Sequence, residues 1–447
     1  MTQQNNYLDK VLLRILLLLF IGILSYNLSY AQTDQFLKGV NLAGAEFGEG
    51  NLPGNYGSDY IYPTKEEVDY FMSKGMTVFR IGFRWERLQR SEFSPLNETE
   101  LGRVNEIVNY ATSKGAHVLL NPHNYSRYYG KVVGSSEVTS AAFADFWARV
   151  AEVYKNNPRV MFGLVNEPHD MSTEVWRDNA QAAIDGIRET GSTNLITVPG
   201  NGWTGAHSWF DNWYGSPNAE VMLTINDPAD NMAYEVHQYL DSNYSGASQT
   251  CQSSTIGSEK LIDFTNWLRD NGKVGFLAEF GAAFNNTCMA AIEDMLDHVE
   301  ENQDVWMAWA WWAAGPWWGD GYFLSIEPYS NGDDKPQMAV LENYLDGNVS
   351  TSAEDDDGIP DQTQLAQNYP NPFNPTTNIS YTLPQNSDVT LTVYNMLGQP
   401  VAELVNARQS AGSYTASFDA SGLSSGIYFY RLVAAGQSFT KQMLLVK

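Results

Sequence analysis

The sequence is poor in basic residues. It carries 26 Lys and Arg against 52 Asp and Glu, which gives a net charge of −26 at pH 7. Such a chain repels the phosphates of nucleic acids, so nucleic acid is excluded as a partner. A neutral polymer substrate needs no electrostatic attraction and is compatible with this charge, although acidity alone also serves solubility.

Cysteine is almost absent. The 447 residues include only Cys251 and Cys288, so at most one disulfide can form within the chain. These residues are either free buried thiols or, if the protein is exported, a single disulfide. The N-terminal segment therefore bears directly on their state.

A hydrophobic run long enough to span a membrane is also lacking. The apolar stretch Ile15–Leu24 is short for a span. It follows two basic residues and precedes Ser29-Tyr30-Ala31, which has the small-x-small pattern of a cleavage site. Residues 1–31 are therefore predicted to be a secretory signal peptide, with an uncleaved anchor as the alternative. Export to an oxidising compartment would favour a disulfide between the two cysteines over free thiols.

From about residue 36 to 345, short apolar runs alternate with amphipathic helical patterns. The runs are Phe36–Gly44, Thr77–Phe83, His117–His123, Val160–Asn166, Leu195–Gly200, Ala233–Tyr239, Val274–Glu279 and Val305–Trp312. The helical patterns are Lys65–Lys74, Thr99–Lys114, Ala141–Asn156, Val175–Glu189, Gly257–Asn271 and Met289–Asn302. This alternation predicts a (β/α)₈ TIM barrel over 32–345. The alternative, an open doubly wound sheet, lacks a Gly-rich phosphate turn after the first strand.

The composition changes after the predicted barrel. Residues 346–363 are acidic and poor in large apolar side chains, which predicts a solvated linker. In 364–447, short strand patterns separated by turns predict a small antiparallel β-sandwich. These patterns are Thr377–Leu383, Val389–Tyr394, Ser413–Phe418, Ile427–Leu432 and Ser438–Val446. No paired carboxylates or histidine cluster occur there, so the segment is assigned no chemistry. It could instead bind glycans, which would require exposed aromatic residues on one face.

Carboxylates end two of the apolar runs. Val160–Asn166 is followed by Glu167 and Pro168, and Val274–Glu279 ends in the second carboxylate. TIM barrels place catalysis at the C-terminal ends of their strands. The polar or aromatic residues at these ends are Arg80, His123, Asn166, Glu167, His237, Tyr239, Glu279 and Trp312. A strand-end glutamate can also be a structural ion pair, but two of them beside two histidines predict catalysis.

Two carboxylates facing one another are the equipment of a retaining glycosidase. One must hold a proton for the leaving oxygen, while the other stays ionised to attack the anomeric carbon. Arg80, as a fixed cation, could keep one carboxylate ionised, and Tyr239 could donate a hydrogen bond to the same group. A metal site built from the two histidines and two glutamates is the alternative, which a neighbouring arginine disfavours.

The remaining strand-end residues are predicted to hold the substrate. Asn166 could bind the hydroxyl next to the anomeric carbon, where hydrogen bonds strengthen in the transition state. His123 and His237 could orient other hydroxyls.

Tryptophan is more abundant than a core requires, with 13 in the chain. Flat indole faces beside polar groups suit sugar rings. Trp312 is the predicted platform. Trp203, Trp209 and Trp213 follow the fifth strand, and Trp203 and Trp209 are also predicted to bind the substrate. Each could instead pack in the core, as we expect for Trp309.

These motifs resemble glycoside hydrolase family 5, and in particular its fungal-type endo-β-1,4-glucanases. The resemblance covers 36–345 and rests on Asn166-Glu167-Pro168, His237-x-Tyr239, Leu-Ala-Glu279-Phe-Gly, Asn121–Tyr125 and the Trp-rich run 311–318. It implies that Glu167 is the general acid/base and Glu279 the nucleophile. It also implies a disulfide between Cys251 and Cys288, and no cofactor or metal. The other strand-end residues named above match the family's cleavage subsite.

The C-terminal segment resembles the sorting domain of the type IX secretion system. The resemblance rests on the Asn368-x-Pro-Asn-Pro opening, the Gly426–Tyr428 strand and the tail Lys441–Lys447. It implies export through the inner membrane by the signal peptide, then through the outer membrane by the secretion machinery, with removal of this domain.

The sequence thus predicts a secreted, monomeric cellulase without a stable membrane span. Mannan, mixed-linkage glucan and xyloglucan remain alternative substrates. A non-catalytic carbohydrate-binding surface protein is the alternative of a different class.

Overall fold

The computed structural model describes residues 35–345 and, in the C-terminal part, 363–365, 368, 371, 373–396, 398–410, 412–434 and 436–446. The predicted signal peptide and almost all of the predicted linker lie outside these residues. The described residues form two compact units, one on each side of the predicted linker. The boundaries given above stay predictions.

The N-terminal unit is a closed barrel of eight parallel strands, as predicted. Its strands are β1 (Leu37–Ala45), β2 (Val78–Phe83), β3 (His117–Pro122), β6 (Val160–Gly163), β7 (Ile196–Pro199), β8 (Met232–His237), β9 (Gly275–Phe280) and β10 (Trp306–Ala314). Each predicted run contains one of these strands or overlaps most of it. The run Val160–Asn166 is longer than its strand, because β6 ends at Gly163.

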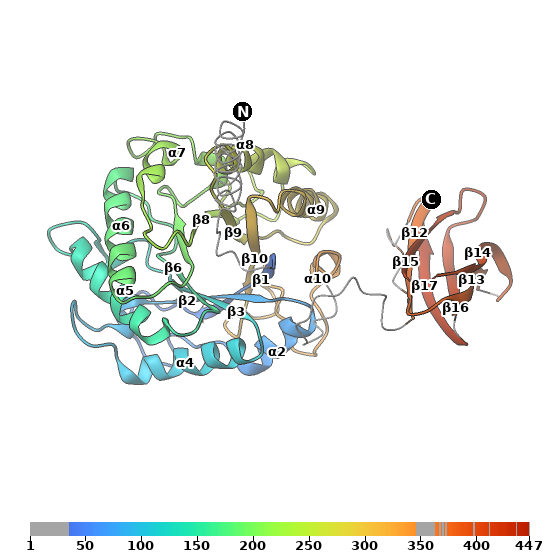
Figure 1. Cartoon of the computed structure of the whole chain (residues 1–447), viewed down its shortest axis with the longest axis horizontal. Helices are drawn as coiled ribbons and strands as arrows, with labels where there is room; N and C mark the ends of the chain where they lie inside the picture. The colour runs from blue at the N-terminus through green and yellow to red at the C-terminus, as the bar shows by residue number, and fades with distance from the viewer. Residues whose placement is uncertain are drawn as a thin grey trace, which may run out of the picture. The chain divides into compact units, whose positions relative to one another are not determined.

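Helices surround the strands (Figure 1). They are α2 (Lys65–Ser73), α3 (Trp85–Leu88), α4 (Glu98–Ser113), α5 (Ser140–Tyr154), α6 (Thr173–Glu189), α7 (Asn218–Val221), α8 (Ile256–Asp270), α9 (Asn286–Glu301) and α10 (Met338–Leu341). Short elements complete the loops: the hairpin β4 (Arg127–Tyr128) and β5 (Lys131–Val132), and the 3₁₀ turns η1 (Ala206–Ser208) and η2 (Met222–Thr224). Side-chain oxygens cap several of the long helices, for example Asn97 on α4 and Asn285 on α9.

The barrel interior is apolar near the start of the strands and polar further along. Leu37, Val78, Leu119 and Met161 belong to an interior apolar cluster that is separate from the larger core between strands and helices. Alternate residues of a strand share a face. The side chains two positions further along β2 and β3, Arg80 and Asn121, therefore also point inward.

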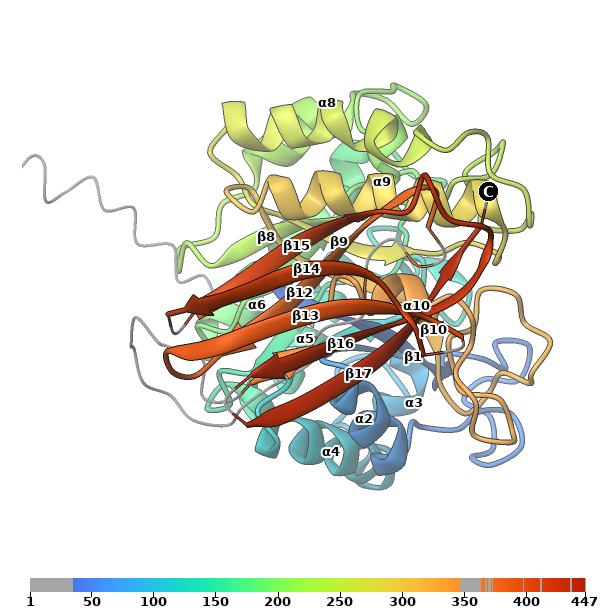
Figure 2. The same ribbon diagram turned by 90° about the vertical axis from the view of Figure 1, so that its right-hand side faces the viewer.

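The C-terminal unit is a sandwich of two antiparallel sheets, as predicted. One sheet contains β11 (Gln364–Leu365), β12 (Thr376–Leu383) and β15 (Gly412–Asp419). The other, whose four strands lie side by side in Figure 2, contains β14 (Pro400–Gln409), β13 (Ser387–Asn395), β16 (Gly426–Ala434) and β17 (Gln437–Leu445). Strands β11 and β14 do not correspond to any predicted strand pattern. The described residues of this unit include no exposed aromatic side chain, which counts against a glycan-binding module.

The described part of the chain contains no helix that combines the length and the apolar character needed to cross a bilayer.

Candidate active site

Arg80 lies at the centre of the polar interior. Its side chain is buried, and its guanidinium donates four hydrogen bonds. They reach Asn41 Oδ1 at 2.8 Å, Glu279 Oε1 at 2.6 Å, Asn166 Oδ1 at 2.7 Å and Glu235 Oε1 at 2.9 Å. The predicted position at the end of its strand is wrong, because Arg80 is the third residue of β2. Its long side chain still reaches Glu279 near the end of β9 and Asn166 after the end of β6.

A bulge in β9 turns Glu279 into the barrel. Next to β8, Val236 pairs with Leu277 while the following residue, His237, pairs with Glu279, so β9 carries one extra residue. A bulge re-aims the side chains that follow it. Ala278 and Glu279 consequently both face inward: Ala278 joins the interior cluster, and Glu279 meets Arg80.

The Glu279 carboxylate is held by two donors. Besides Arg80, the Tyr239 hydroxyl donates to Glu279 Oε2 at 3.1 Å. Burial raises the pKa of the Glu279 carboxyl, and the charges of His237 and Arg80 oppose this rise. Both hydrogen bonds favour the ionised form of the carboxyl, which can only accept.

Glu167 faces Glu279 from the loop after β6. Its backbone has a φ of 43°, a left-handed conformation that is uncommon outside glycine. Its carboxylate accepts from His237 Nδ1 at 2.8 Å. One carboxyl oxygen of Glu167, one of Glu279 and a ring nitrogen of His237 all lie within 4.8 Å of one another. The side chain of Glu167 is 18% exposed and that of Glu279 is 4% exposed, so the two carboxyls differ in their access to water.

His237 and Glu235 complete a network of alternating charges. Burial lowers the pKa of His237, but the surrounding carboxylates outweigh this effect and raise the pKa to about 9. Burial raises the pKa of Glu235, but the Arg80 charge, His237 and the Thr197 hydrogen bond together outweigh this effect and bring the pKa to about 2. Glu235 Oε1 lies 3.4 Å from His237 Nε2. Near neutral pH the site therefore contains two buried cations, Arg80 and His237, among three carboxyl groups.

Sequence reasoning missed Glu235, although the signal was present. Glu235, His237 and Tyr239 are spaced two apart, so an inward-facing His237 implies an inward-facing Glu235. It also missed the buried Glu46, just after β1. Burial raises the pKa of Glu46 to about 7. Its Oε2 accepts from the Gly44 backbone N–H at 2.7 Å. Its carboxyl packs over Gly82, where an added Cβ would lie only 3.0 Å from the Glu46 carboxyl carbon.

Asn166 and His123 are joined in the same network. Because Asn166 Oδ1 accepts from Arg80, its amide nitrogen points to His123 Nε2 at 3.1 Å. Burial lowers the pKa of His123 well below its usual value, and the cations Arg84 and Arg80 lower it further. His123 is therefore neutral and accepts the Asn166 hydrogen bond.

The predicted tryptophan platforms differ in position. Trp312 is half-buried within β10 and stacks on His123, with ring centroids 5.6 Å apart and planes at 29°. Trp203 is 42% exposed and stacks on His169, whose Nδ1 lies 2.9 Å from the Glu167 carbonyl oxygen. The structure thus brings Trp312 and Trp203 to the site.

The prediction for Trp209 is wrong. Its side chain is 0% exposed and packs against Phe264, Trp267 and Tyr234 in the core. The indole therefore has no face open to a ligand. Trp213, from the same loop, is exposed, and Trp309 is buried as expected.

The disulfide between Cys251 and Cys288 is present. It ties the loop after β8 to the first turn of α9.

Glu167, His237 and Glu279 are close enough together to be metal ligands. Their charges do not fit that role. Arg80 already donates a hydrogen bond to Glu279 at 2.6 Å. The pKa of His237 is raised to about 9, so this residue is a cation near neutral pH. Since metal binding requires neutral imidazole and free carboxylates, this donor set suits proton transfer better.

Comparison with known proteins agrees with this geometry. Residues 34–315 match the sequence model of cellulase (glycosyl hydrolase family 5). The chain belongs to glycoside hydrolase family 5. It is 43% identical over 308 residues to the endo-beta-1,4-glucanase B of Aspergillus niger, covering 69% of this chain and 89% of the relative. It is also 43% identical over 311 residues to the endo-beta-1,4-glucanase A of Emericella nidulans, covering 69% of this chain and 92% of that one.

Solved structures of family 5 enzymes superpose on the barrel. A crystal structure of an endo-beta-1,4-glucanase from Xanthomonas axonopodis pv. citri matches with a TM-score of 0.68 and 45% identity, covering 69% of this chain and 98% of that one. Residues 367–447 match the secretion system C-terminal sorting domain. This glycoside hydrolase therefore carries a sorting domain, which indicates export.

Proposed function

We propose that this protein is a secreted, retaining endo-β-1,4-glucanase that hydrolyses internal β-1,4-glucosidic bonds. The observation that carries the proposal is the approach of Glu167 and Glu279, whose carboxyl oxygens lie within 4.8 Å. Retaining glycosidases hold their carboxyls about 5–5.5 Å apart, whereas inverting enzymes need about 6.5–9.5 Å to accommodate a water molecule. The spacing here leaves room for direct attack by a carboxylate.

In the first step, Glu279 acts as the nucleophile. Its carboxylate attacks the anomeric carbon while the bond from that carbon to the leaving oxygen breaks. Glu167 gives its proton to the leaving oxygen, so the aglycone departs as an alcohol. Arg80 and Tyr239 support this role, because both donate to Glu279 and favour its ionised form.

In the second step, water releases the sugar. The ionised Glu167 accepts a proton from the water, whose oxygen bonds to the anomeric carbon as the bond to Glu279 breaks. Two inversions restore the original configuration. His237 Nδ1, 2.8 Å from Glu167, can exchange a proton with it and so prepare it for either role.

The groups around the pair would hold the sugar ring. Asn166 would bind the hydroxyl beside the anomeric carbon, and His123 and His237 would orient others. Trp312 would stack under the ring, with its indole fixed by a hydrogen bond from Nε1 to the Tyr322 hydroxyl at 3.1 Å. Trp203 would contact a sugar on the Glu167 side.

The experiment measures products and their stereochemistry. The full chain should release reducing ends from carboxymethylcellulose, and NMR at early times should show products with the β-configuration at the new reducing end. Glu279→Gln should abolish turnover. Glu167→Gln should lower it by about 10²–10⁴, the usual contribution of acid–base catalysis. Initial α-products, or a fully active Glu279→Gln variant, would contradict the mechanism.

A substrate panel separates the alternatives. The same two carboxylates could act on mannan, mixed-linkage glucan or xyloglucan, so their relative rates decide the preferred polymer. The names of the relatives favour β-1,4-glucan. Binding without hydrolysis of any of these polymers would instead support a carbohydrate-binding surface protein.

The sorting domain would direct the enzyme through the outer membrane by a type IX system after a signal peptide has carried it through the inner one. Its match to residues 367–447 supports this route. Deleting those residues should retain the enzyme inside the cell envelope. Mass spectrometry of the exported enzyme would show whether both ends are removed.

A further inference from the structure

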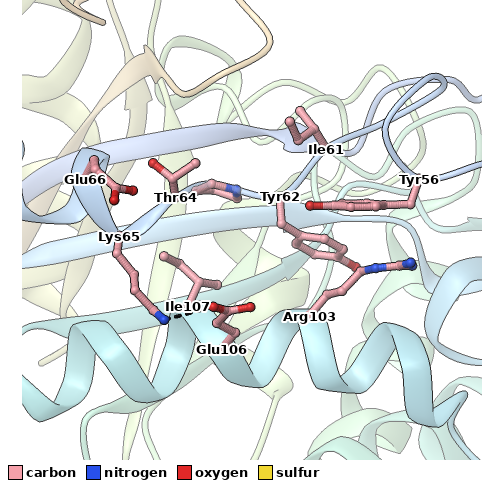
Figure 3. Close-up of a pocket in the computed structure, with 10 residues that line it drawn as sticks. Tyr56, Ile61, Tyr62, Thr64, Lys65, Glu66, Arg103, Glu106 and Ile107 are labelled. Carbon is pink, nitrogen blue, oxygen red and sulfur yellow. Dashed lines mark hydrogen bonds and ion pairs between the residues drawn. The ribbon is translucent and has the colours of Figure 1, made fainter.

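Two neighbouring hollows lie on the surface between the loop after β1 and helix α4. The first has a volume of about 370 Å³ and the second about 400 Å³. Tyr56 and Arg103 line both, so the two hollows adjoin at this pair. Figure 3 shows the first extending from Lys65 and Glu66 at one end to Tyr56 at the other. None of the residues placed at the catalytic site lines either one. We call the pair of hollows the Tyr56 groove.

The Tyr56 ring is exposed but firmly held. It is 46% exposed, and the Arg103 guanidinium carbon lies 4.1 Å from its ring centroid. The Tyr62 ring lies 6.3 Å away and is stacked. Arg103 in turn pairs with the buried Glu100, which also accepts from the Tyr60 hydroxyl at 2.6 Å. An aromatic ring fixed in this way loses little conformational freedom when a ligand packs on it.

The charges along the groove are balanced in a strongly acidic chain. Its lining contains three basic residues and three acidic residues: Lys65, Arg90, Arg103, Glu66, Glu100 and Glu106. Lys65 and Glu106 form an ion pair at 2.9 Å. Such a lining selects neither anions nor cations. It offers hydrogen-bond donors and acceptors beside an aromatic ring, which is the combination that a neutral, hydroxyl-rich sugar chain requires.

We propose that the Tyr56 groove is a second binding site for a β-glucan chain, distinct from the catalytic site. The proposal rests on the proposed function only for the identity of the glucan. Two adjoining hollows suit a linear chain of several sugar units better than a single small molecule. Binding there would keep the enzyme on an insoluble polymer between cleavage events.

The test compares Tyr56→Ala with Phe93→Ala in the full chain. Phe93 is a matched control because its ring is 51% exposed and lines neither hollow. Binding to insoluble cellulose is measured by depletion from solution, and hydrolysis of cellopentaose is measured in parallel. Loss of one aromatic contact should weaken cellulose binding by about three- to tenfold in Tyr56→Ala. Phe93→Ala should bind like the wild type, and Tyr56→Phe should keep binding because it keeps the ring.

Each outcome separates the two proposals. If the wild type cleaves no β-glucan, the proposed function fails and this site fails with it. If the wild type cleaves cellopentaose and Tyr56→Ala binds cellulose as well as Phe93→Ala does, only the second site is refuted. If Tyr56→Ala lost cellopentaose hydrolysis as strongly as it lost cellulose binding, the second site would also be refuted, because the groove would then belong to the catalytic site.

Discussion

The buried carboxylate of Glu235 offers the sharpest test of how the barrel interior is held together. It accepts from Arg80 at 2.9 Å and from the Thr197 hydroxyl at 2.5 Å, and it lies 3.4 Å from His237 Nε2. Glu235→Gln keeps the size of the side chain but removes its charge. We therefore expect a loss of stability that depends on pH, without a change of fold.

The size of the effect follows from the pKa of Glu235, which is about 2 in the folded protein against an ordinary value of 4.5. A carboxyl with a lowered pKa stabilises the fold fully above pH 4.5, and this contribution is lost as the pH falls through 2. The drop in pKa corresponds to about 3 kcal/mol in the free energy of unfolding. Glu235→Gln should thus be less stable by about 3 kcal/mol at pH 6 and by about 2 kcal/mol at pH 3.5.

Guanidinium unfolding of the full chain, followed by tryptophan fluorescence, measures this difference. All 13 tryptophans lie between positions 85 and 318, so the signal reports on the barrel alone. Glu220→Gln is the control, because Glu220 is exposed and its substitution changes the net charge equally. An equal loss at both pH values would mean that packing, not charge, explains Glu235. A loss below about 0.5 kcal/mol at pH 6, the range of ordinary surface substitutions, would refute the argument.

Three further predictions use the same chain. The pKa of His237 is raised to about 9, so its contribution to stability is complete below pH 6.5 and disappears as the pH rises through 9. In urea titrations, the stability of the wild type relative to His237→Asn should therefore fall by about 3 kcal/mol over that range. Trp312→Ala should lower kcat/KM on cellopentaose, whereas Trp209→Ala should destabilise the barrel by about 3–5 kcal/mol and leave KM unchanged. If Trp209→Ala lowered kcat/KM and Trp312→Ala only destabilised the barrel, Trp209 would be the platform and Trp312 the core residue. Replacing Cys251 and Cys288 with Ser should cost about 4 kcal/mol for a separation of 37 residues, and dithiothreitol should then have no further effect on the unfolding midpoint.

The barrel could be predicted because its strands are buried on both faces. Runs such as Val160–Asn166 are apolar almost throughout, and a helical pattern follows most of them. The small sandwich was harder. Its strand β14, Pro400–Gln409, has no fully buried side chain, so it lacks the clear alternation of buried and exposed residues that marks β12. A proline in the sequence usually argues against a strand, but Pro400 is the first residue of β14, where a strand accepts proline.

The site residues could be named from their place at the strand ends, but their orientation could not. The inward turn of Glu279 depends on the bulge in β9, and the pairing that creates it involves β8, about 40 residues earlier in the sequence. Trp209 illustrates the opposite error. An indole in a loop beside the site has the same sequence signature whether it faces a ligand or the core, and only the positions of Phe264 and Trp267 decide that it is buried.

The charge count of the site supports the proposed division of roles between the two glutamates. Three carboxylates, Glu167, Glu235 and Glu279, surround two cations, Arg80 and His237, so one further proton would make the network neutral. Protonating Glu235 or Glu279 would weaken an ion pair with Arg80, and at Glu279 it would also disturb the Tyr239 hydrogen bond. Among the residues that the structure describes, Glu167 forms no ion pair with an arginine, and it is the more exposed carboxyl of the facing pair. These contacts therefore support the proposed mechanism, in which Glu167 supplies the transferable proton and Glu279 acts as the carboxylate beside Arg80.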